Sequence, residues 1–273
     1  MAAARIVDWD DAYANAPHIP GAEAYPARWA AAAAAFRAGL PAERRREGLA
    51  YGRHPREALD LFLPEGTAQG VVVWVHGGYW MRFDRSDWSH LAAGPLARGW
   101  AVAMISYPLA PEARIGAIVR SVGEAVTQVA AALPGPIVLA GHSAGGHLAA
   151  RQVCAGALPE RAAARIVRVA PVSGIFDLRP LLRLALNADL RLDAEEAAAE
   201  SPALLQPREG VAVRVWVGGA ERPEFLRQSE LIANVWTGLR AEMSLTVAPG
   251  RHHFDVIEGL ADPESDLVAA LLD

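Results

Sequence analysis

The amino-acid sequence predicts an α/β protein with a mainly parallel sheet and helices on both of its faces. From residue 57 onward, short apolar runs rich in β-branched residues alternate with longer segments of helical periodicity. Hydrophobic residues make up 52% of the 273 residues and charged residues only 21%, so the chain can fill a large core. Strands that alternate with helices require crossover connections, which place helices over both faces of a parallel sheet.

Residues 1–40 precede this alternation and are expected to form an N-terminal arm followed by a helix. Residues 8–20 are polar, aromatic and interrupted by proline, which predicts irregular structure. Residues 22–38 favour a helix, because residues 30–35 are all alanine and alanine has the highest helix propensity. The basic run at residues 44–46 is typical of a solvated helix end.

The remaining elements follow in order from their apolar patterns. Strands are predicted at 58–63, 71–75, 101–106, 137–140, 166–172, 211–217 and 243–247. Helical periodicity predicts helices at 86–98, 116–132, 144–156, 224–239 and 264–272. Two short helical stretches, 178–186 and 194–200, break the alternation, so residues 178–205 are expected to form a small cap insertion. Because no internal repeat or linker occurs, residues 1–273 are predicted to form a single domain.

One Gly-x-Ser-x-Gly motif, Gly141-His142-Ser143-Ala144-Gly145, lies between a predicted strand and a predicted helix. This is the strand–turn–helix arrangement of a nucleophilic serine. The turn holds its serine at strained backbone angles, and side chains two residues before and after it would collide, so both positions need glycine. Ser143 is therefore the candidate nucleophile, and the backbone amide of Ala144 is a candidate oxyanion-hole donor.

A second motif, His76-Gly77-Gly78-Tyr79-Trp80, follows the strand predicted at 71–75. Glycines let backbone N–H groups point into a site without a Cβ in the way, so Gly77 and Gly78 are further candidates for the oxyanion hole. His76 is expected to hold this loop by hydrogen bonds rather than to take part in catalysis. Tyr79 and Trp80 are candidate substrate-binding walls for an aromatic group, with packing of the loop as the alternative.

The acid and the base of such a site must come late in the chain. His253 follows the last predicted strand, but its neighbour His252 competes with it. Glu221 follows the strand predicted at 211–217 and fits best as the acid, with Glu224 as the nearest competitor. The order serine, acid, histidine is that of the α/β-hydrolase fold. Asp177 also follows a strand end, but it is expected to cap the next helix.

Other features exclude several classes of protein. The net charge of −5 gives no electrostatic basis for binding nucleic acid or an anionic membrane, and no apolar run of about 18 residues predicts a membrane span. The eight histidines lack the spacing of a zinc site and no phosphate-binding glycine loop occurs, so no metal and no cofactor are expected. The single cysteine, Cys154, is expected to be a buried structural thiol, and a cytoplasmic location is the default. The expected partner is a small-molecule substrate, and a homodimer is left open.

Four segments together resemble the arylformamidase (kynurenine formamidase) family of α/β-hydrolases. They are His76 to Trp80, Gly141 to Leu148, Pro223-Glu224-Phe225 and His253-Phe254-Asp255. The resemblance spans essentially the whole chain. It implies a sheet of about eight strands and a catalytic triad of serine, acid and histidine.

The resemblance also assigns the members of the triad. Ser143 matches the family's nucleophile, and His253 matches the histidine of its Asp-His-Phe motif, in which His252 replaces the aspartate. Glu221 matches an aspartate that the family has shortly before Pro-Glu-Phe. Glutamate is one methylene longer but can still orient a histidine, since Ser-His-Glu triads exist in this fold.

The implied reaction is hydrolysis of N-formyl-L-kynurenine to L-kynurenine and formate, a step of tryptophan catabolism, through an acyl-enzyme and without a cofactor. A general short-chain carboxylesterase would use the same residues and is the alternative. A non-catalytic binding protein with a hydrolase fold is disfavoured, because Ser143 and His253 are both present. Substrate specificity is expected to lie in the N-terminal arm and in the cap at 178–205.

Overall fold

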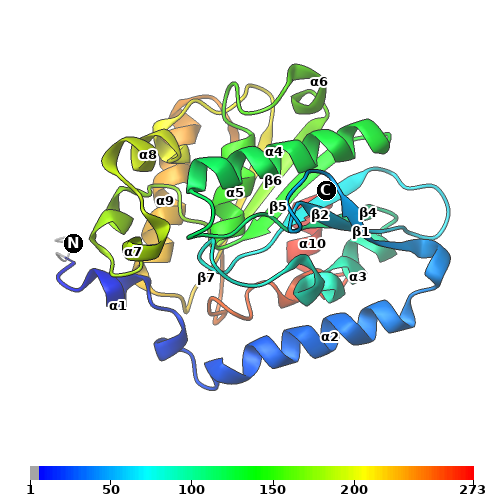
Figure 1. Cartoon of the computed structure of the whole chain (residues 1–273), viewed down its shortest axis with the longest axis horizontal. Coiled ribbons are helices and arrows are strands. Elements are labelled where there is room, and N and C mark those ends of the chain that lie inside the picture. The colour runs from blue at the N-terminus through cyan, green and yellow to red at the C-terminus, as the bar shows by residue number, and fades with distance from the viewer. Residues whose placement is uncertain (1–5) are drawn as a thin grey trace.

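The computed structural model describes residues 6–273, which are built around one eight-stranded sheet (Figure 1). The strands lie in the order β1-β2-β4-β3-β5-β6-β7-β8. β2 runs antiparallel to both of its neighbours, and all other neighbouring strands are parallel, which confirms the predicted mainly parallel sheet. The strand bounds are β1 Arg45–Ala50, β2 Ala58–Phe62, β3 Val71–Val75, β4 Ala101–Ile105, β5 Ile137–His142, β6 Ile166–Val172, β7 Ala212–Gly218 and β8 Glu242–Ala248.

Helices cover both faces of this sheet. One core packs against α4 (Ile115–Ala132), α5 (Ala144–Gln152) and α9 (Pro223–Gly238), and the other against α2 (Tyr25–Gly39) and α10 (Asp266–Leu272). Successive side chains of the inner strands enter opposite cores because a strand has a period of two residues. In β3, for example, Val71, Val73 and Val75 belong to the first core and Val72 and Trp74 to the second. Burial on both faces explains why β3 is apolar throughout.

The remaining helices are short and lie mostly in the connections. The α-helices are α1 Trp9–Tyr13, α3 Ala93–Ala97, α6 Glu160–Ala163, α7 Asn187–Leu190 and α8 Ala194–Ala199. The 3₁₀ turns are η1 Ala16–His18, η2 Ala22–Ala24, η3 Ala42–Arg44, η4 Arg85–Ala92, η5 Arg179–Arg183, η6 Pro202–Leu204 and η7 Glu258–Ala261. Within residues 6–273, no helix combines the length and the apolarity needed to cross a membrane.

Two predictions for the N-terminal region are wrong. Arg45 and Arg46 begin the edge strand β1 rather than ending a helix. The sequence of β1 has no apolar alternation because most of its side chains are exposed, and it is held by backbone pairing with β2. Residues 8–20 are not irregular throughout, since they form α1 and η1; the Asp8 side chain caps α1 by accepting from the N–H of Asp11 at 2.9 Å.

The alanine-rich α2 lies along the outside of the molecule and packs mainly against η4 (Figure 1). Its buried residues, Tyr25, Trp29 and Ala33, are spaced four apart and therefore form one narrow stripe. This stripe explains why a helix with so weak an amphipathic pattern still has a defined position.

Candidate active site

Ser143 occupies a strained turn between β5 and α5, with φ 56° and ψ −118°. Few residues other than glycine adopt such angles, and strain of this kind is concentrated at functional sites. A Cβ on Gly141 would lie 2.3 Å from the carbonyl oxygen of Gly145, and a Cβ on Gly145 would lie 2.0 Å from that of Val75. Both glycines are needed, as expected, but the collisions they avoid are with backbone atoms rather than between two side chains.

Glu221 and His253 meet at the same edge of the sheet, after β7 and β8. His253 Nδ1 donates to Glu221 Oε2 at 2.6 Å, and their side chains are only 4% and 0% exposed. The other oxygen, Glu221 Oε1, accepts from the N–H of Gly218 at 2.9 Å and from the hydroxyl of Ser173. Because Nδ1 carries the donated proton, His253 Nε2 is the nitrogen left to accept another. Ser173 is a site residue that the sequence patterns did not predict; its signal was its place directly after β6.

The structure separates Glu221 from its competitor Glu224. Glu224 is buried, but its carboxylate accepts from the Arg227 guanidinium at 2.6 and 2.7 Å and from the Tyr13 hydroxyl at 2.6 Å. Gln228 also donates to the Tyr13 hydroxyl, at 2.9 Å. Glu224 therefore belongs to a structural network that holds the N-terminal arm against α9.

The structure also separates His253 from His252. His252 Nε2 lies 3.1 Å from the Tyr25 hydroxyl, and His252 Nδ1 accepts from the backbone N–H groups of Phe254 and Asp255. Both ring nitrogens of His252 therefore already have hydrogen-bond partners, whereas the ring of His253 faces Glu221.

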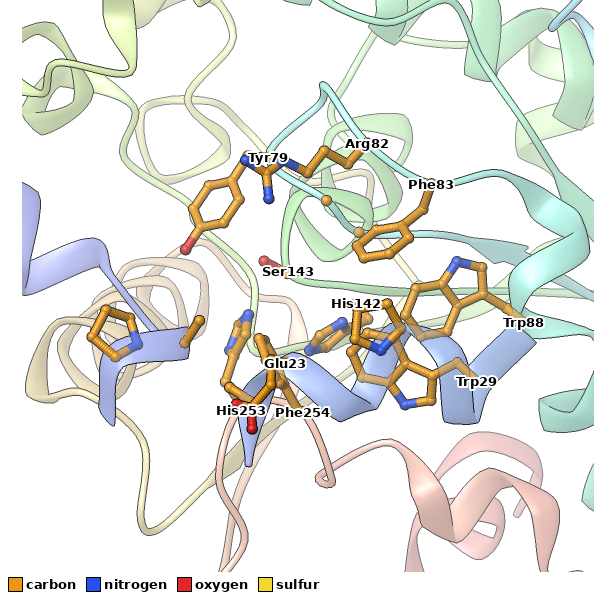
Figure 2. A pocket seen from close by; sticks show the side chains of 16 residues that line it. Glu23, Trp29, Tyr79, Arg82, Phe83, Trp88, His142, Ser143, His253 and Phe254 are labelled. Carbon is orange, nitrogen blue, oxygen red and sulfur yellow. The ribbon is translucent and has the colours of Figure 1, made fainter. Parts of the chain in front are cut away.

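Ser143 and His253 open onto one cavity of about 400 Å³ (Figure 2). The hydroxyl of Ser143 and the ring of His253 both point into it. The lining residues are Ala16, Pro17, Ala22, Glu23, Pro26, Trp29, Gly77, Gly78, Tyr79, Arg82, Phe83, Trp88, His142, Ser143, His253 and Phe254.

Four aromatic side chains form one wall of this cavity, and none of them was predicted from the sequence. The ring of Trp29 lies 4.7 Å from that of Trp88, 5.8 Å from that of Phe83 and 5.3 Å from that of Phe254. Figure 2 shows these rings gathered on one side of Ser143. They come from three separate segments of the chain, around residues 29, 83–88 and 254, so no single local pattern links all of them.

Tyr79 and Trp80 have different surroundings in the structure. Tyr79 lines the cavity, and its hydroxyl donates to the carbonyl of Tyr13 at 2.8 Å. Trp80 is fully buried and does not line the cavity, and its indole N–H donates to His147 Nδ1 at 3.3 Å. Both residues have positive φ, 54° and 60°, so the chain turns sharply between them. The expectation of a substrate wall is therefore wrong for Trp80, which instead fastens its loop to the core.

Residues of the N-terminal arm and of α2, rather than residues 178–205, help to line the cavity. Six of its lining residues lie between positions 16 and 29, and none lies between 178 and 205. The 178–205 segment instead supports the arm, since Ala185 N–H donates to Asp10 at 2.8 Å and the Arg183 guanidinium lies 5.5 Å from the ring centre of Trp9.

Gly77 and Gly78 bring the backbone of their loop close to Ser143. A Cβ on Gly77 would lie 2.8 Å from the carbonyl oxygen of His142 and 3.2 Å from Ser143 Cβ, and Gly78 has φ 109°. His76 lies behind this loop, fully buried, where its Nδ1 donates to the carbonyl of Gly77 at 2.7 Å and its ring stacks on Tyr107 at 4.4 Å. Burial lowers the pKa of His76 to about 4, so the ring is neutral at physiological pH.

His142 is a further residue that the sequence patterns did not assign to the cavity. Its ring lies 4.6 Å from that of His253. Burial, and then the neighbouring His253, hold the pKa of His142 well below its usual value. A neutral His142 therefore packs against His253 without adding a positive charge beside it.

Two other predictions about single residues are confirmed. Asp177 accepts from the N–H of Arg179, the first residue of η5, at 3.1 Å and pairs with its guanidinium at 2.9 Å. Cys154 is buried, and burial raises the pKa of its thiol to about 12. In the part of the chain that the structure describes, His, Cys, Asp and Glu side chains form no group of three that could hold a metal ion.

Comparisons with known proteins show which family the chain belongs to. The family model described as BD-FAE matches residues 59–167. The chain is 31% identical over 235 residues to the kynurenine formamidase of Salmo salar, covering 81% of this chain and 79% of that protein. It is 30% identical over 231 residues to the kynurenine formamidase of Danio rerio, covering 81% and 78%.

Solved structures share the fold. A protein of Silicibacter sp. TM1040, described as a candidate thioesterase, is 54% identical with a TM-score of 0.93, covering 97% of this chain and 99% of that one. An esterase of Pyrobaculum calidifontis is 18% identical with a TM-score of 0.71, covering 91% and 89%, which supports the α/β-hydrolase fold alone. The length and identity of the match to the fish enzymes show that the chain is a hydrolase and a member of the kynurenine formamidase family.

Proposed function

We propose that the protein is an arylformamidase that hydrolyses N-formyl-L-kynurenine to L-kynurenine and formate with a Ser143–His253–Glu221 triad. The observation that carries this proposal is the cavity in which Ser143 and His253 face an aromatic wall. The fish relatives, named kynurenine formamidases, support the same substrate. Such an activity would serve tryptophan catabolism.

In the first half of the reaction, His253 Nε2 takes the proton of Ser143 as the serine oxygen attacks the formyl carbon. The hydrogen bond from His253 Nδ1 to Glu221 keeps the ring oriented and stabilises the imidazolium that forms. The imidazolium then protonates the departing aryl amine, and formyl-Ser143 remains. In the second half, His253 deprotonates a water molecule that attacks this ester and releases formate.

The negative charge that develops on the formyl oxygen needs backbone donors. We assign this role to the N–H groups of Gly77, Gly78 and Ala144. Ala144 is the first residue of α5, so the helix N-terminus adds its positive partial charge at the same place. The close approach of Gly77 to Ser143 supports this assignment.

The aromatic wall favours an aryl leaving group. Trp29, Trp88, Phe83 and Phe254 offer ring faces and edges to a planar aromatic substrate. An aryl formamide is also easier to cleave than a peptide, because its nitrogen lone pair is partly delocalised into the ring.

We also propose that the chain acts as one domain in which the N-terminal arm, rather than the 178–205 segment, covers the substrate. The arm is fastened on both sides of the site, through Tyr13 to Glu224 and through Tyr25 to His252. Which substrates enter the cavity, and how they bind, would therefore depend on residues that precede the sheet.

A short-chain carboxylesterase is the second candidate. A probable isoprenylcysteine α-carbonyl methylesterase of Oryza sativa is 36% identical over 109 residues, which cover 37% of this chain. The solved protein described as a candidate thioesterase points to ester chemistry as well. An ester substrate would use the same triad, oxyanion hole and acyl-enzyme.

The deciding experiment compares kcat/KM for N-formyl-L-kynurenine and p-nitrophenyl acetate, with Ser143→Ala as the blank. We expect a preference for the formamide with kcat/KM of at least about 10⁴ M⁻¹s⁻¹, and a loss of about 10⁴–10⁶ in kcat in the variant. Strong ester hydrolysis with negligible formamide turnover would instead establish the carboxylesterase.

A further inference from the structure

Among the cavity-lining residues that the structure describes, Arg82 is the one arginine or lysine. Within residues 6–273, its guanidinium has no hydrogen-bond or ion-pair partner. Its neighbours differ in this respect, since Arg85 pairs with Asp60 at 2.8 Å and Arg56 pairs with Asp84 at 3.2 Å. An unpaired guanidinium at a cavity can bind an anionic group of a ligand without first breaking a contact within the protein.

The loop that carries Arg82 is tightly shaped. The N–H groups of Met81 and Arg82 both donate to the carbonyl of Gly78, at 2.9 and 3.0 Å. A Cβ on Gly78 would lie 2.5 Å from the Arg82 carbonyl oxygen. Tyr79, Trp80 and Phe83 all have positive φ, a conformation that is strained for residues other than glycine. The strain sends Trp80 into the core and places Tyr79 and Arg82 at the cavity.

Arg82 also has a defined position relative to Ser143. Its guanidinium lies beside the Tyr79 ring, and in the view of Figure 2 it is on the side of Ser143 away from His253. Burial raises the pKa of the Tyr79 phenol, whereas the nearby Arg82 acts to lower it. Glu23, which also lines the cavity and has the opposite charge, lies on the His253 side. A carboxylate in the cavity is therefore attracted toward Arg82 and repelled from the region of Glu23.

We propose that Arg82 is a specificity-determining residue that binds the carboxylate of the substrate's amino-acid side chain. The proposal rests on the function proposed above and makes it more specific. N-formyl-L-kynurenine carries this carboxylate on a short chain ortho to its formamide. The formyl group at Ser143 and the ring on the aromatic wall would leave that chain free to reach Arg82. Guanidinium and carboxylate form paired, charge-assisted hydrogen bonds.

The test measures binding without turnover, by calorimetry on the Ser143→Ala protein. The two ligands are N-formyl-L-kynurenine and N-formylkynuramine, which has the same ring, formamide and ammonium group but no carboxylate. We expect Arg82→Met in this background to raise the Kd of N-formyl-L-kynurenine about tenfold and to change that of N-formylkynuramine by less than twofold. Arg82→Lys should restore part of the affinity, and added salt should weaken the binding that depends on Arg82.

Arg46→Met is the matched control, because Arg46 is exposed on the edge strand β1 and does not line the cavity. It removes the same charge and should leave both Kd values unchanged. The proposal is overturned if Arg82→Met weakens both ligands equally, if it weakens neither, or if the Ser143→Ala protein binds neither ligand. Failure of the proposed function would give a different result. N-formyl-L-kynurenine would still bind in a way that depends on Arg82, but the unmodified enzyme would not hydrolyse it.

Discussion

At the scale of single residues, the two carboxylates that compete in the sequence have opposite surroundings in the structure. Glu221 accepts from His253, Gly218 and Ser173, and within residues 6–273 it forms no ion pair with an arginine or lysine. The negative charge of Glu224 is paired with Arg227, and its carboxylate accepts a hydrogen bond from Tyr13. The first arrangement orients a histidine, whereas the second anchors the arm.

Exchanging each carboxylate for an amide should separate these roles. Glu221→Gln places an N–H₂ group among donors, so His253 loses its orientation and kcat should fall by up to roughly 10⁴. Glu224→Gln weakens the contacts to Arg227 and Tyr13, so it should lower the free energy of unfolding by about 1–3 kcal/mol while kcat changes less than tenfold. Steady-state kinetics and urea unfolding of both variants measure the two effects. A loss of less than tenfold for Glu221→Gln would remove Glu221 from the triad.

At the scale of elements, the turn between β5 and α5 depends on backbone atoms that come from another strand. Gly145 lies against the carbonyl oxygens of Val75 and His76, at the end of β3. The neighbouring strands β3 and β5 are paired in parallel, from Val71 opposite Ile137 to Val75 opposite Gly141. The helix α5 therefore begins directly against the end of β3, which leaves no room for a side chain at position 145.

Gly145→Ala should consequently destabilise the fold strongly. Its Cβ would lie 2.0 Å from the Val75 carbonyl oxygen, so the strand or the helix must shift, and the free energy of unfolding should fall by at least about 3 kcal/mol. Gly39→Ala, at the end of α2, meets no atom within 4 Å and should change it by less than about 1 kcal/mol. Urea midpoints of both variants check this prediction. Equal midpoints would mean that the turn relaxes easily.

The arm is the second element whose role can be measured. Trp29 of α2 belongs to the aromatic wall, so Trp29→Leu should raise KM for N-formyl-L-kynurenine about tenfold through loss of ring contacts. Trp100 is similarly buried but does not line the cavity, and Trp100→Leu should cost stability without raising KM. Kinetics at a temperature where both variants stay folded distinguish the two. An unchanged KM for Trp29→Leu would separate the wall from substrate binding.

At the scale of the whole molecule, buried neutral histidines make stability depend on pH. Burial lowers the pKa values of both His76 and His147 to about 4, below the ordinary value of 6.5. Between these values the unfolded chain binds protons that the folded chain does not. The stabilisation is thus fully present above pH 6.5 and is lost as the pH falls toward 4. Each ring contributes roughly 3 kcal/mol, at about 1.4 kcal/mol for each pH unit.

The free energy of unfolding should therefore fall steadily between pH 6.5 and pH 4. Urea unfolding at a series of pH values measures the slope. His147→Gln removes one of the buried neutral rings and should reduce the slope by about one proton. The variant is also less stable, because His147 bonds to Trp80 and to the carbonyl of Glu200. An identical slope in the variant would show that other groups control the acid transition.

The sequence by itself determined the features that depend on neighbouring residues in the chain. The apolar run of β3 predicts a strand buried on both faces, and Gly141 to Gly145 predict the strained turn, because strand periodicity and glycine requirements are local properties. The order of Ser143, Glu221 and His253 followed from their places after β5, β7 and β8, whose carboxyl ends lie at the same end of a parallel sheet.

Only the tertiary structure decided what depends on packing between distant segments. The edge strand β1 forms through backbone pairing that leaves no apolar pattern, and the aromatic wall joins rings from three separate segments. Trp80 is buried in the core while Tyr79 faces the cavity. Glu224 pairs with Arg227 and accepts a hydrogen bond from Tyr13. Residues of the N-terminal region line the cavity, and residues 178–205 do not, for the same reason. The packing of the folded chain in three dimensions, and not distance along the sequence, determines which surfaces are buried against one another.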